Sequence, residues 1–275
     1  MLSPHVTFVV REPPGVHTGL VALAGHTCSL QPHEVGTAAQ AKEVDATIRR
    51  MLREPRSVPT TTAPEHIRLA LVKCPLLTSA KIAAARVTGQ SVVTTDTYES
   101  MARSRYVSAL GVAMALGELG GQDVDEMAVA RDPGAQHWSP TASCSSGAEL
   151  EDCHILLLAV SPEPRRGALR AVSGYMKDAM DGRAVVEMLD QVKRDAGEVV
   201  QVFAKAEADP TGSIRGHRHT MNTDSDIHGT RHARAAVGGL LAGLTGDPKL
   251  YVSGGAEGQG PPGGGSLCVV YRVPE

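Results

Sequence analysis

The sequence predicts an α/β fold of layered α+β modules, built from two homologous strand–helix repeats. Apolar runs of strand length alternate with helical segments through both halves of the chain, a pattern typical of sheets covered by helices. The two halves also carry the same short motifs in the same order. At about 100–200 residues per domain, a chain of 275 residues has room for two such modules.

The first half contains more than half of the predicted elements. Val6–Val10 is expected to be a short strand, although the breaker Pro13–Gly15 follows it closely. A helix over 32–54 is expected to start near Ser29 or Gln31, and the basic residues in its last turns suit the negative end of its dipole. Further strands are predicted at 20–24, 67–72 and 155–160, and further helices at 79–86 and 104–119.

A linker is predicted at 161–165, where two prolines and two charged residues break any periodicity. After this linker the order of elements begins again. Strands are predicted at 169–173, 199–204, 251–253 and 267–271, and helices at 181–194 and 232–244.

The internal repeat is the strongest signal in the sequence. Four motifs of the first half return in the second half, and an apolar strand follows the last member of each set. The pairs are LVALAGHT at Leu20 with LRAVSGYM at Leu169, ALVKC (Lys73) with VFAKA (Lys205), SRYVSALGVA (Arg105) with ARAAVGGLLA (Arg234), and Ser145–Glu149 with Ser253–Glu257. A duplication kept only for folding would leave the lysines as surface charges, but both end apolar strands, where a solvated charge is not expected.

Composition excludes several classes of function. The net charge is −3 with acidic and basic residues interspersed, and aromatic residues make up 3% of the chain, so a nucleic-acid partner is not expected. The longest apolar run, Ile155–Val160, is far shorter than the roughly 20 residues of a membrane helix, and the N-terminus lacks the pattern of a signal peptide. Five scattered cysteines without a CxxC motif favour a reducing cytoplasm.

Lysines that end apolar strands, serines followed by glycine, and arginines are the parts of an acyl-transfer site. A serine hydroxyl becomes a good nucleophile only when a base takes its proton. Lysine is such a base when burial and a neighbouring cation keep its amine neutral. Glycine-rich turns add donors for a developing oxyanion, and arginine offers a planar fork to carbonyl oxygens. The set predicts hydrolysis of an amide or imide, and two facing copies suit a small flat substrate with repeated carbonyls.

A group of histidines offers a rival hypothesis of zinc-dependent hydrolysis. His228 and His232 are four residues apart and could share a helix face, with His217 and His219 close in sequence. Gly229 lies between the first two, and no carboxylate or cysteine completes an obvious ligand set. Structural or substrate-loop roles are therefore favoured for these histidines.

Four segments are long and specific enough to compare with known families: VKCPLLTSAKIAAARVTG, VTTDTYESM, AKAEADPTGSIRGHRHTMNTDSDIHGTRHARA and YVSGGAEGQGPPGGG. They resemble the cyanuric acid amidohydrolase and barbiturase family of ring-opening amidohydrolases. The resemblance implies a three-module architecture with approximate threefold symmetry around one active site. It also implies hydrolysis of one C–N bond of a cyclic imide: cyanuric acid to carboxybiuret, then biuret and CO2, or barbituric acid to ureidomalonate.

The resemblance also implies roles for single residues. Lys73 matches the general base of the family and Ser145 its nucleophile. The implied substrate contacts are Arg105, Ser145, Ser146, Arg234, Ser253 and Gly254. The family usually has glycine or a small apolar residue at the position of Ser146, so the choice of nucleophile stays open between Ser145 and Ser146.

A structural divalent cation is implied as well, since the family binds one near its third module. The resemblance assigns it to the side chain of Glu207 and to backbone carbonyls of the glycine-rich loop. These carbonyls belong to Ala256, Gln259, Gly260, Pro261 and Gly264. An all-oxygen set with one carboxylate fits Mg²⁺, or Ca²⁺, rather than zinc.

The resemblance divides the chain into residues 1–18 as the end of a first module, 19–165 as a second-type module and 166–275 as a third-type module. A substrate wall without most of the first module would orient the ring poorly, and misplacement by about 1 Å can cost about 10²-fold in rate. A non-catalytic relative with weak or no activity is therefore a second hypothesis beside an active hydrolase. The family is usually homotetrameric, so a homo-oligomer is expected.

Overall fold

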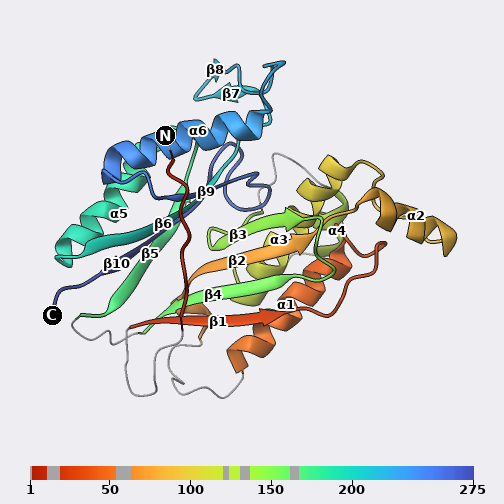
Figure 1. The fold of residues 1–275 in the computed structure, drawn as a ribbon, viewed down its shortest axis with the longest axis horizontal. Coiled ribbons are helices and arrows are strands. Elements are labelled where there is room, and N and C mark those ends of the chain that lie inside the picture. The colour runs from red at the N-terminus through yellow and green to blue at the C-terminus, as the bar shows by residue number, and fades with distance from the viewer. Residues whose placement is uncertain (1, 11–18, 54–62, 120–123, 131–136, 162–166) are drawn as a thin grey trace.

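The structure, a computed structural model, describes residues 2–10, 19–53, 63–119, 124–130, 137–161 and 167–275. These residues form two four-stranded sheets with helices on the outer face of each sheet, and one small two-stranded hairpin (Figure 1). The linker predicted between the two halves lies outside the described residues apart from Ser161.

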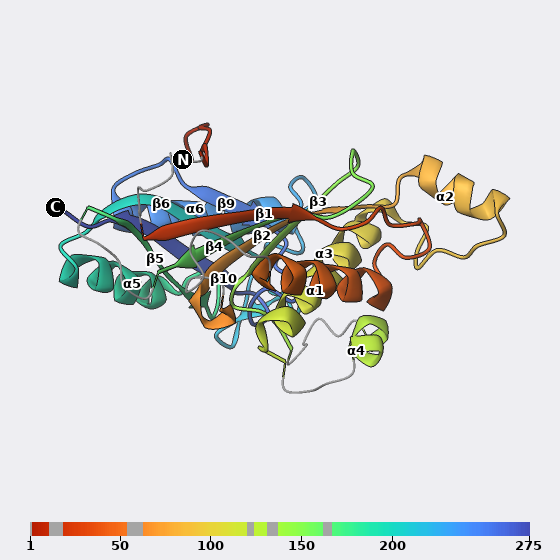
Figure 2. The same cartoon turned by 90° about the horizontal axis from the view of Figure 1, so that it is seen from below.

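The first sheet has the strand order β1-β4-β2-β3. Its strands are β1 (Leu20–His26), β2 (Ile67–Pro75), β3 (Ala142–Gly147) and β4 (His154–Val160). β4 is antiparallel to both of its neighbours, whereas β2 and β3 run parallel. The helical elements of this half are α1 (Ala38–Arg53), η2 (Pro64–His66), α2 (Ser79–Val87), α3 (Thr97–Leu116) and α4 (Val124–Ala130), of which α1 and α3 cover one face of the sheet (Figure 2).

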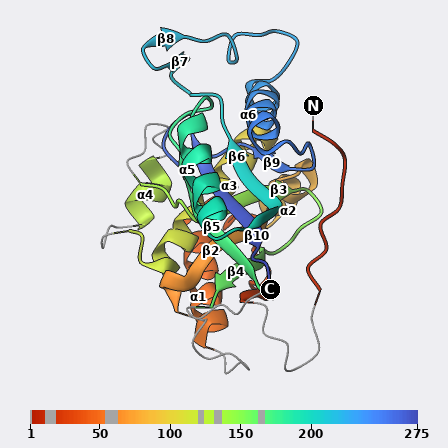
Figure 3. The same cartoon turned by 90° about the vertical axis from the view of Figure 1, so that its left-hand side faces the viewer.

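The second sheet has the order β5-β10-β6-β9. Its strands are β5 (Leu169–Met176), β6 (Glu198–Ala206), β9 (Tyr251–Gly254) and β10 (Gly265–Arg272). The helices α5 (Gly182–Arg194) and α6 (Gly229–Thr245) pack on its outer face, and the hairpin of β7 (Ser213–Ile214) and β8 (His217–Arg218) projects beyond α6 (Figure 3).

The two sheets repeat one topology. Each has an antiparallel edge strand, a central antiparallel pair and a parallel second edge strand, in the same order along the chain. Lys73 of β2 is the register partner of Ser145 in β3, and Lys205 of β6 is the register partner of Ser253 in β9. The predicted α/β fold class with an internal repeat is confirmed.

The inner faces of the two sheets pack against each other, while each outer face packs on its own helices. The buried cluster between the sheets consists of Leu69, Leu158, Ala171, Phe203, Cys268 and Val270. The edge strands β3 and β9 meet beside this cluster. The contact between these strands is the seam of the molecule, and the ends of the lysine-bearing strands β2 and β6 lie beside it.

Helix α3 begins seven residues before the predicted start at Ser104. The Asp96 side chain caps the helix by accepting the N–H of Glu99 at 2.7 Å, so the helix starts at Thr97. Arg105 therefore lies within the helix and does not open it as predicted.

Helix α1 begins at Ala38, later than the predicted start near Gln31. The residues before it form a turn in which Gly36 adopts a φ of 78°, a left-handed conformation that interrupts a helix. The turn is closed by hydrogen bonds that include Thr37 N–H to the Glu34 carbonyl at 3.1 Å.

The strand predicted at Val6–Val10 does not form. Residues 2–10 are attached to the second repeat by side-chain hydrogen bonds and single backbone contacts, not by a strand ladder. The Gln201 amide donates to the Thr7 hydroxyl at 2.8 Å, and Ser3 N–H donates to the Pro248 carbonyl at 2.9 Å. Most of its apolar side chains, such as Phe8 at 80% exposure, consequently point to solvent.

Two expectations drawn from composition concern membranes and disulfides. Within the described part of the chain, no helix combines the length and apolar character that a membrane span requires. All five cysteines are free thiols, and four of them are buried.

Gly111 and Gly243 provide a matched test of the helix packing. A Cβ at Gly111 in α3 would lie 2.5 Å from the Ala41 carbonyl oxygen of α1, whereas a Cβ at Gly243 in α6 would meet nothing within 4 Å. We expect Gly111→Ala to lower the free energy of unfolding by about 1–3 kcal/mol through overpacking. Gly243→Ala should raise it by about 0.5–1 kcal/mol through helix propensity. Equal effects in urea denaturation would contradict the close approach of α1 and α3.

Candidate functional site

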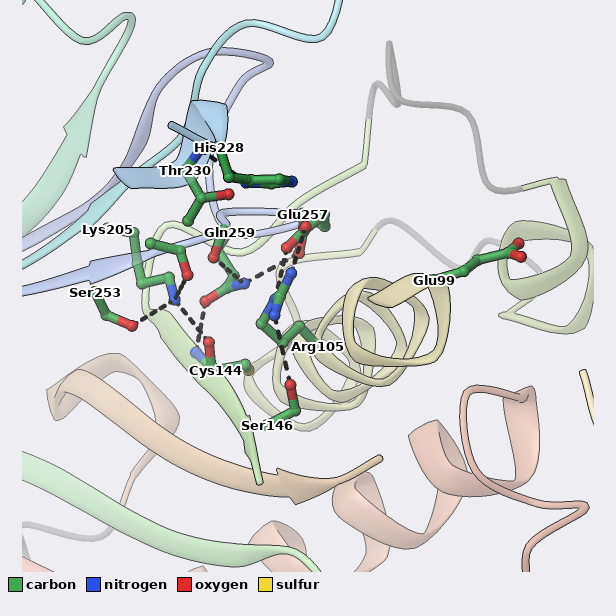
Figure 4. Close-up of polar contacts among 12 residues, drawn as sticks. Glu99, Arg105, Cys144, Ser146, Lys205, His228, Thr230, Ser253, Glu257 and Gln259 are labelled. Atoms are coloured by element: carbon green, nitrogen blue, oxygen red, sulfur yellow. Dashed lines mark hydrogen bonds and ion pairs between the residues drawn. The ribbon is translucent and has the colours of Figure 1, made fainter. Parts of the chain in front are cut away.

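Lys205 is the best-formed polar centre at the seam. It is 1% exposed, although it carries an amine. Its Nζ lies 2.7 Å from the Cys144 carbonyl oxygen, 3.0 Å from the Ser253 hydroxyl and 3.5 Å from the Gly254 carbonyl oxygen (Figure 4). The amine of the second repeat is thus bound both to its own serine and to the serine strand β3 of the first repeat.

The surroundings of Lys205 satisfy either protonation state. Burial, and after it the positive charge of Arg105, lowers the pKa of Lys205 from 10.5 to about 8. A neutral amine can donate to the two carbonyls and accept from the Ser253 hydroxyl, while a charged amine can donate to all three. The amine can therefore lose or gain a proton without rearrangement, which is the property required of a base.

Arg105 crosses the seam in the opposite direction. From α3 of the first repeat, its Nε and Nη2 donate to the two carboxylate oxygens of Glu257 at 2.8 and 2.7 Å. Its Nη1 lies 3.4 Å from the Ser146 hydroxyl (Figure 4). Burial disfavours both charges, but the pairing raises the pKa of Arg105 and lowers that of Glu257 from their ordinary values.

Glycine at 255 makes this pairing possible. A Cβ on Gly255 would lie 2.7 Å from a guanidinium nitrogen of Arg105, and the residue has a φ of 79°. The planar guanidinium therefore packs directly on the backbone of the second repeat.

Lys73 and Ser145 of the first repeat are register partners in β2 and β3, in a more open setting than the second pair. The Lys73 side chain is 43% exposed, and its Nζ donates to the Ser146 carbonyl at 3.2 Å, with Glu149 at 3.9 Å. Among the hydrogen bonds of the described residues, none joins Lys73 to a serine hydroxyl. Lys73 thus contacts the backbone of strand β3, whereas Lys205 contacts a serine hydroxyl.

A cavity of about 580 Å³ opens beside the first pair. Lys73, Ser145 and Ser143 line it, together with His154 of β4 and Tyr251 of β9. The Ser143 hydroxyl is buried without a hydrogen-bond partner among the described residues. A polar group on a small ligand in this cavity could satisfy it.

The predicted substrate contacts of the second repeat form one small surface. Ser253 and Gly254 end β9, and a Cβ on Gly254 would lie 2.2 Å from the Thr230 methyl and 2.8 Å from the Arg234 Cδ. Glycine is required there because α6 approaches the strand so closely. Arg234 is exposed at the edge of this surface, so its guanidinium is accessible.

Five of the six predicted cation ligands lie in one loop, 255–264, between β9 and β10, and the sixth, Glu207, contacts this loop. Glu207 follows β6, and its carboxylate accepts the Gly263 N–H at 3.3 Å. Burial, and after it the negative charge of Glu257, raises the pKa of Glu207. Two carboxylates, Glu207 and Glu257, thus lie close together beside a loop rich in backbone carbonyls. The loop positions are Ala256, Gln259, Gly260, Pro261 and Gly264.

The loop carbonyls have remaining acceptor capacity. The Ala256 carbonyl accepts Gln259 N–H and the Pro261 carbonyl accepts Gly264 N–H, both at 2.8 Å. Each carbonyl has a second lone pair, so these bonds do not prevent ligation. Within the described residues there is no group of three or more His, Cys, Asp or Glu side chains suited to a metal. The predicted cation ligands differ from such a cluster, because they consist of one carboxylate, that of Glu207, and backbone carbonyl oxygens.

Three features of the site differ from the sequence predictions or were missed by them. Ser145 and Ser146 lie inside strand β3 and not on a turn. Glu257 is the last residue of the Ser253–Glu257 motif, and no role for it was predicted from the sequence, yet it pairs with Arg105. The side chain of Gln259 is fully buried and accepts the Cys144 N–H at 2.5 Å. The shared Ala-Glu of the two serine motifs was the available signal for Glu257, whereas nothing in the sequence indicated the Gln259 contact.

Three of the four histidines in this group have local side-chain partners. His228 caps α6 through the Thr230 N–H at 3.2 Å, and His232 pairs with Asp224 at 2.9 Å. His219 contacts the Asp209 carbonyl at 3.1 Å. These contacts are those of helix-capping and loop-bracing residues.

Comparison with known proteins gives consistent matches. A family model for amidohydrolase ring-opening proteins matches residues 1–272. A cyanuric acid amidohydrolase from Sarocladium sp is 56% identical over 273 residues, which are 99% of this chain and 77% of that protein. One from Pseudonocardia dioxanivorans is 55% identical over 275 residues, again 99% of this chain and 77% of the relative.

Solved structures agree with the sequence matches. A structure described as "Cyanuric acid hydrolase: evolutionary innovation by structural concatenation" aligns with a TM-score of 0.83 and 39% identity, covering 96% of this chain and 71% of the other. A cyanuric acid hydrolase from A. caulinodans aligns with a TM-score of 0.83 and 41% identity, covering 93% and 72%.

The Lys205 environment predicts a specific dependence of stability on pH. Because the pKa of Lys205 is about 8 in the folded chain and 10.5 as a free side chain, the unfolded chain binds the extra proton between these values. The contribution of Lys205 to the free energy of unfolding should therefore rise by about 2–3 kcal/mol from about pH 8 to about pH 10.5. Subtracting the pH profile of Lys205→Met from that of the wild type isolates this term. A flat difference would contradict it.

Proposed function

Since the chain belongs to the ring-opening amidohydrolase family, we propose that it hydrolyses one C–N bond of cyanuric acid, forming carboxybiuret that decays to biuret and CO2. The observation that supports this most directly is the Lys73–Ser145 register pair beside a cavity, together with a second Lys–Ser pair in which the Lys205 amine lies 3.0 Å from the Ser253 hydroxyl. A lysine with a lowered pKa against a serine is the arrangement of Ser–Lys hydrolases. Lys73 and Ser145 occupy the same register positions in the first repeat.

We assign the nucleophile to Ser145 and the general base to Lys73. Both line the 580 Å³ cavity, whereas Lys205 is enclosed by protein atoms at 1% exposure. A nucleophile must be reachable by the ring, which favours the open pair. Since Lys73 is the register partner of Ser145, we propose that in the substrate complex its amine leaves the Ser146 carbonyl for the Ser145 hydroxyl, as active-site hydrogen bonds often tighten only with substrate bound.

The proposed reaction proceeds through a covalent acyl intermediate. The Ser145 oxygen attacks a ring carbonyl carbon while Lys73 takes the hydroxyl proton. The C–N bond then breaks, and the proton passes from Lys73 to the departing ring nitrogen. Water, deprotonated by Lys73, attacks the acyl ester and releases Ser145 with its proton restored.

The remaining predicted contacts would bind and orient the ring. Arg234, which is exposed, would donate to ring carbonyls, and Arg105 would do so through the N–H groups that Glu257 and Ser146 leave unused. Ser253 and Gly254 at the end of β9 would contact a second edge of the ring. Two similar sets facing one ring match a substrate whose carbonyls repeat around it.

We propose Mg²⁺, with Ca²⁺ as an alternative, at Glu207 and the carbonyls of the 256–264 loop. The support is the raised pKa of Glu207 beside a second carboxylate and the oxygen-only donor set. A bound cation would supply positive charge that keeps Glu207 ionised. Glu207 itself would hold the loop that carries Glu257, and thereby the partner of Arg105.

We propose that the chain forms a homo-oligomer, a homotetramer by family resemblance. Light scattering on the purified chain measures it directly. A monomer at micromolar concentration would contradict it.

Single serine substitutions test the assignment. We expect Ser145→Ala to lower kcat for biuret formation by about 10³-fold or more, because the attacking oxygen is lost. Ser253→Ala should mainly raise KM, and Ser146→Ala should have an intermediate effect. Ser225→Ala, at an exposed loop position, is the control.

Two outcomes would contradict the assignment. If Ser253→Ala abolishes turnover while Ser145→Ala keeps it within about tenfold, the second pair carries the chemistry. If the wild-type chain forms no biuret above the blank, the non-catalytic hypothesis is favoured.

The cation proposal is tested by thermal unfolding. Mg²⁺ should raise the melting temperature of the wild type, since a ligand that binds only the folded chain stabilises it. Glu207→Gln should abolish this response while leaving the melting temperature in a chelator equal or higher, because one buried carboxylate is removed. An unchanged Mg²⁺ response in Glu207→Gln would contradict the assignment, and Glu187→Gln at an exposed helix position is the control.

A further inference from the structure

Strand β3, which carries Ser145 and Ser146, lies at the edge of the first sheet, and among the described strands it pairs with β2 alone. The backbone groups on its other side therefore need partners from elsewhere, because a buried N–H or C=O without a hydrogen bond is costly. The backbone groups on this side of β3 belong to Cys144 and Ala142, and both residues are completely buried.

Side chains of the second repeat occupy this edge in place of another strand. The Gln259 Oε1 accepts the Cys144 N–H at 2.5 Å, and the Lys205 Nζ donates to the Cys144 carbonyl at 2.7 Å. The Ser266 hydroxyl of β10 donates to the Ala142 carbonyl at 2.6 Å. None of these three side chains is more than 2% exposed. Both backbone groups of Cys144 are thus held from across the seam.

The Gln259 amide is fixed in one orientation. Its Nε2 donates to the Glu257 carbonyl at 3.2 Å and to the Gly255 carbonyl at 3.4 Å. A flipped amide would direct its NH2 at the Cys144 N–H and its oxygen at two carbonyls. Gln259 therefore links the loop that pairs with Arg105 to the residue directly before Ser145 (Figure 4).

We infer that Gln259 is a positioning residue, whose side chain, together with Lys205, sets the position of Ser145 by clamping the backbone of Cys144. The carbonyl that Lys205 binds belongs to the peptide that joins Cys144 to Ser145. A shift of this peptide moves the Ser145 oxygen with it, and misplacement by about 1 Å can cost about 10²-fold in rate. This role rests on the proposed function of Ser145. It concerns the Gln259 side chain and is independent of a cation at its carbonyl.

Two variants separate the clamp from general stability. Gln259→Met fills a similar volume without the acceptor for Cys144 N–H or the donors to the loop. Gln259→Glu keeps an oxygen acceptor for Cys144 but loses the donors. Gln201→Met is the matched control, since Gln201 is also buried but bonds to Thr7 and to the Val202 N–H, away from the seam.

Amide hydrogen exchange over residues 142–147 and steady-state kinetics are measured on all four full-length chains. We expect Gln259→Met to speed exchange in this strand by about tenfold or more and to lower kcat by about 10–100-fold, with KM changed by less than about threefold. Gln259→Glu should lose less protection, and Gln201→Met should match the wild type in both measurements.

Each contrary outcome overturns a defined part of the inference. Unchanged exchange in Gln259→Met overturns the clamp. Faster exchange with an unchanged kcat per folded chain overturns the positioning role. A wild type without turnover overturns the proposed function, while exchange in the same samples still decides whether the clamp exists.

Discussion

The structure depends on one hydrogen-bonded amine at the seam between two repeats. Lys205 is buried to 1% exposure, and it binds the carbonyl of Cys144 in the first repeat and the hydroxyl of Ser253 in the second. A buried amine is tolerated in a protein interior only when each of its N–H donors has a hydrogen-bond acceptor. The position of the two sheets relative to each other is therefore coupled to the hydrogen bonds of the Lys205 side chain.

Arg105 makes the reciprocal connection. It extends from the first repeat to Glu257 of the second, so each repeat contributes a cation that is satisfied by the other. The two cations also influence each other, since the charge of Arg105 contributes to the lowered pKa of Lys205. Glu257 balances Arg105, and its negative charge, after burial, raises the pKa of Glu207. The charges that join the two repeats at the seam thus also set one another's pKa values.

Much of this arrangement could be predicted because it depends on local patterns. The duplicated motifs identified Lys73 and Lys205 as equivalent strand-end residues, and the register of both parallel pairs agrees. The limits came from interactions between segments distant in sequence. Whether a lysine at a strand end is buried depends on what packs above it, and Lys205 and Lys73 differ for that reason despite matching motifs. Gln259 gives no periodic signal, because its partner Cys144 is 115 residues away.

The central claim is that burial at the seam lowers the pKa of the Lys205 amine to about 8. Its pKa can be measured directly by NMR titration of lysine side chains labelled with ¹³C at Cε, with Lys205→Met assigning the resonance. The account predicts a midpoint of about 8 for Lys205. A midpoint near the free-lysine value of about 10.4 would contradict it, because burial and the charge of Arg105 would then not disfavour the charged amine.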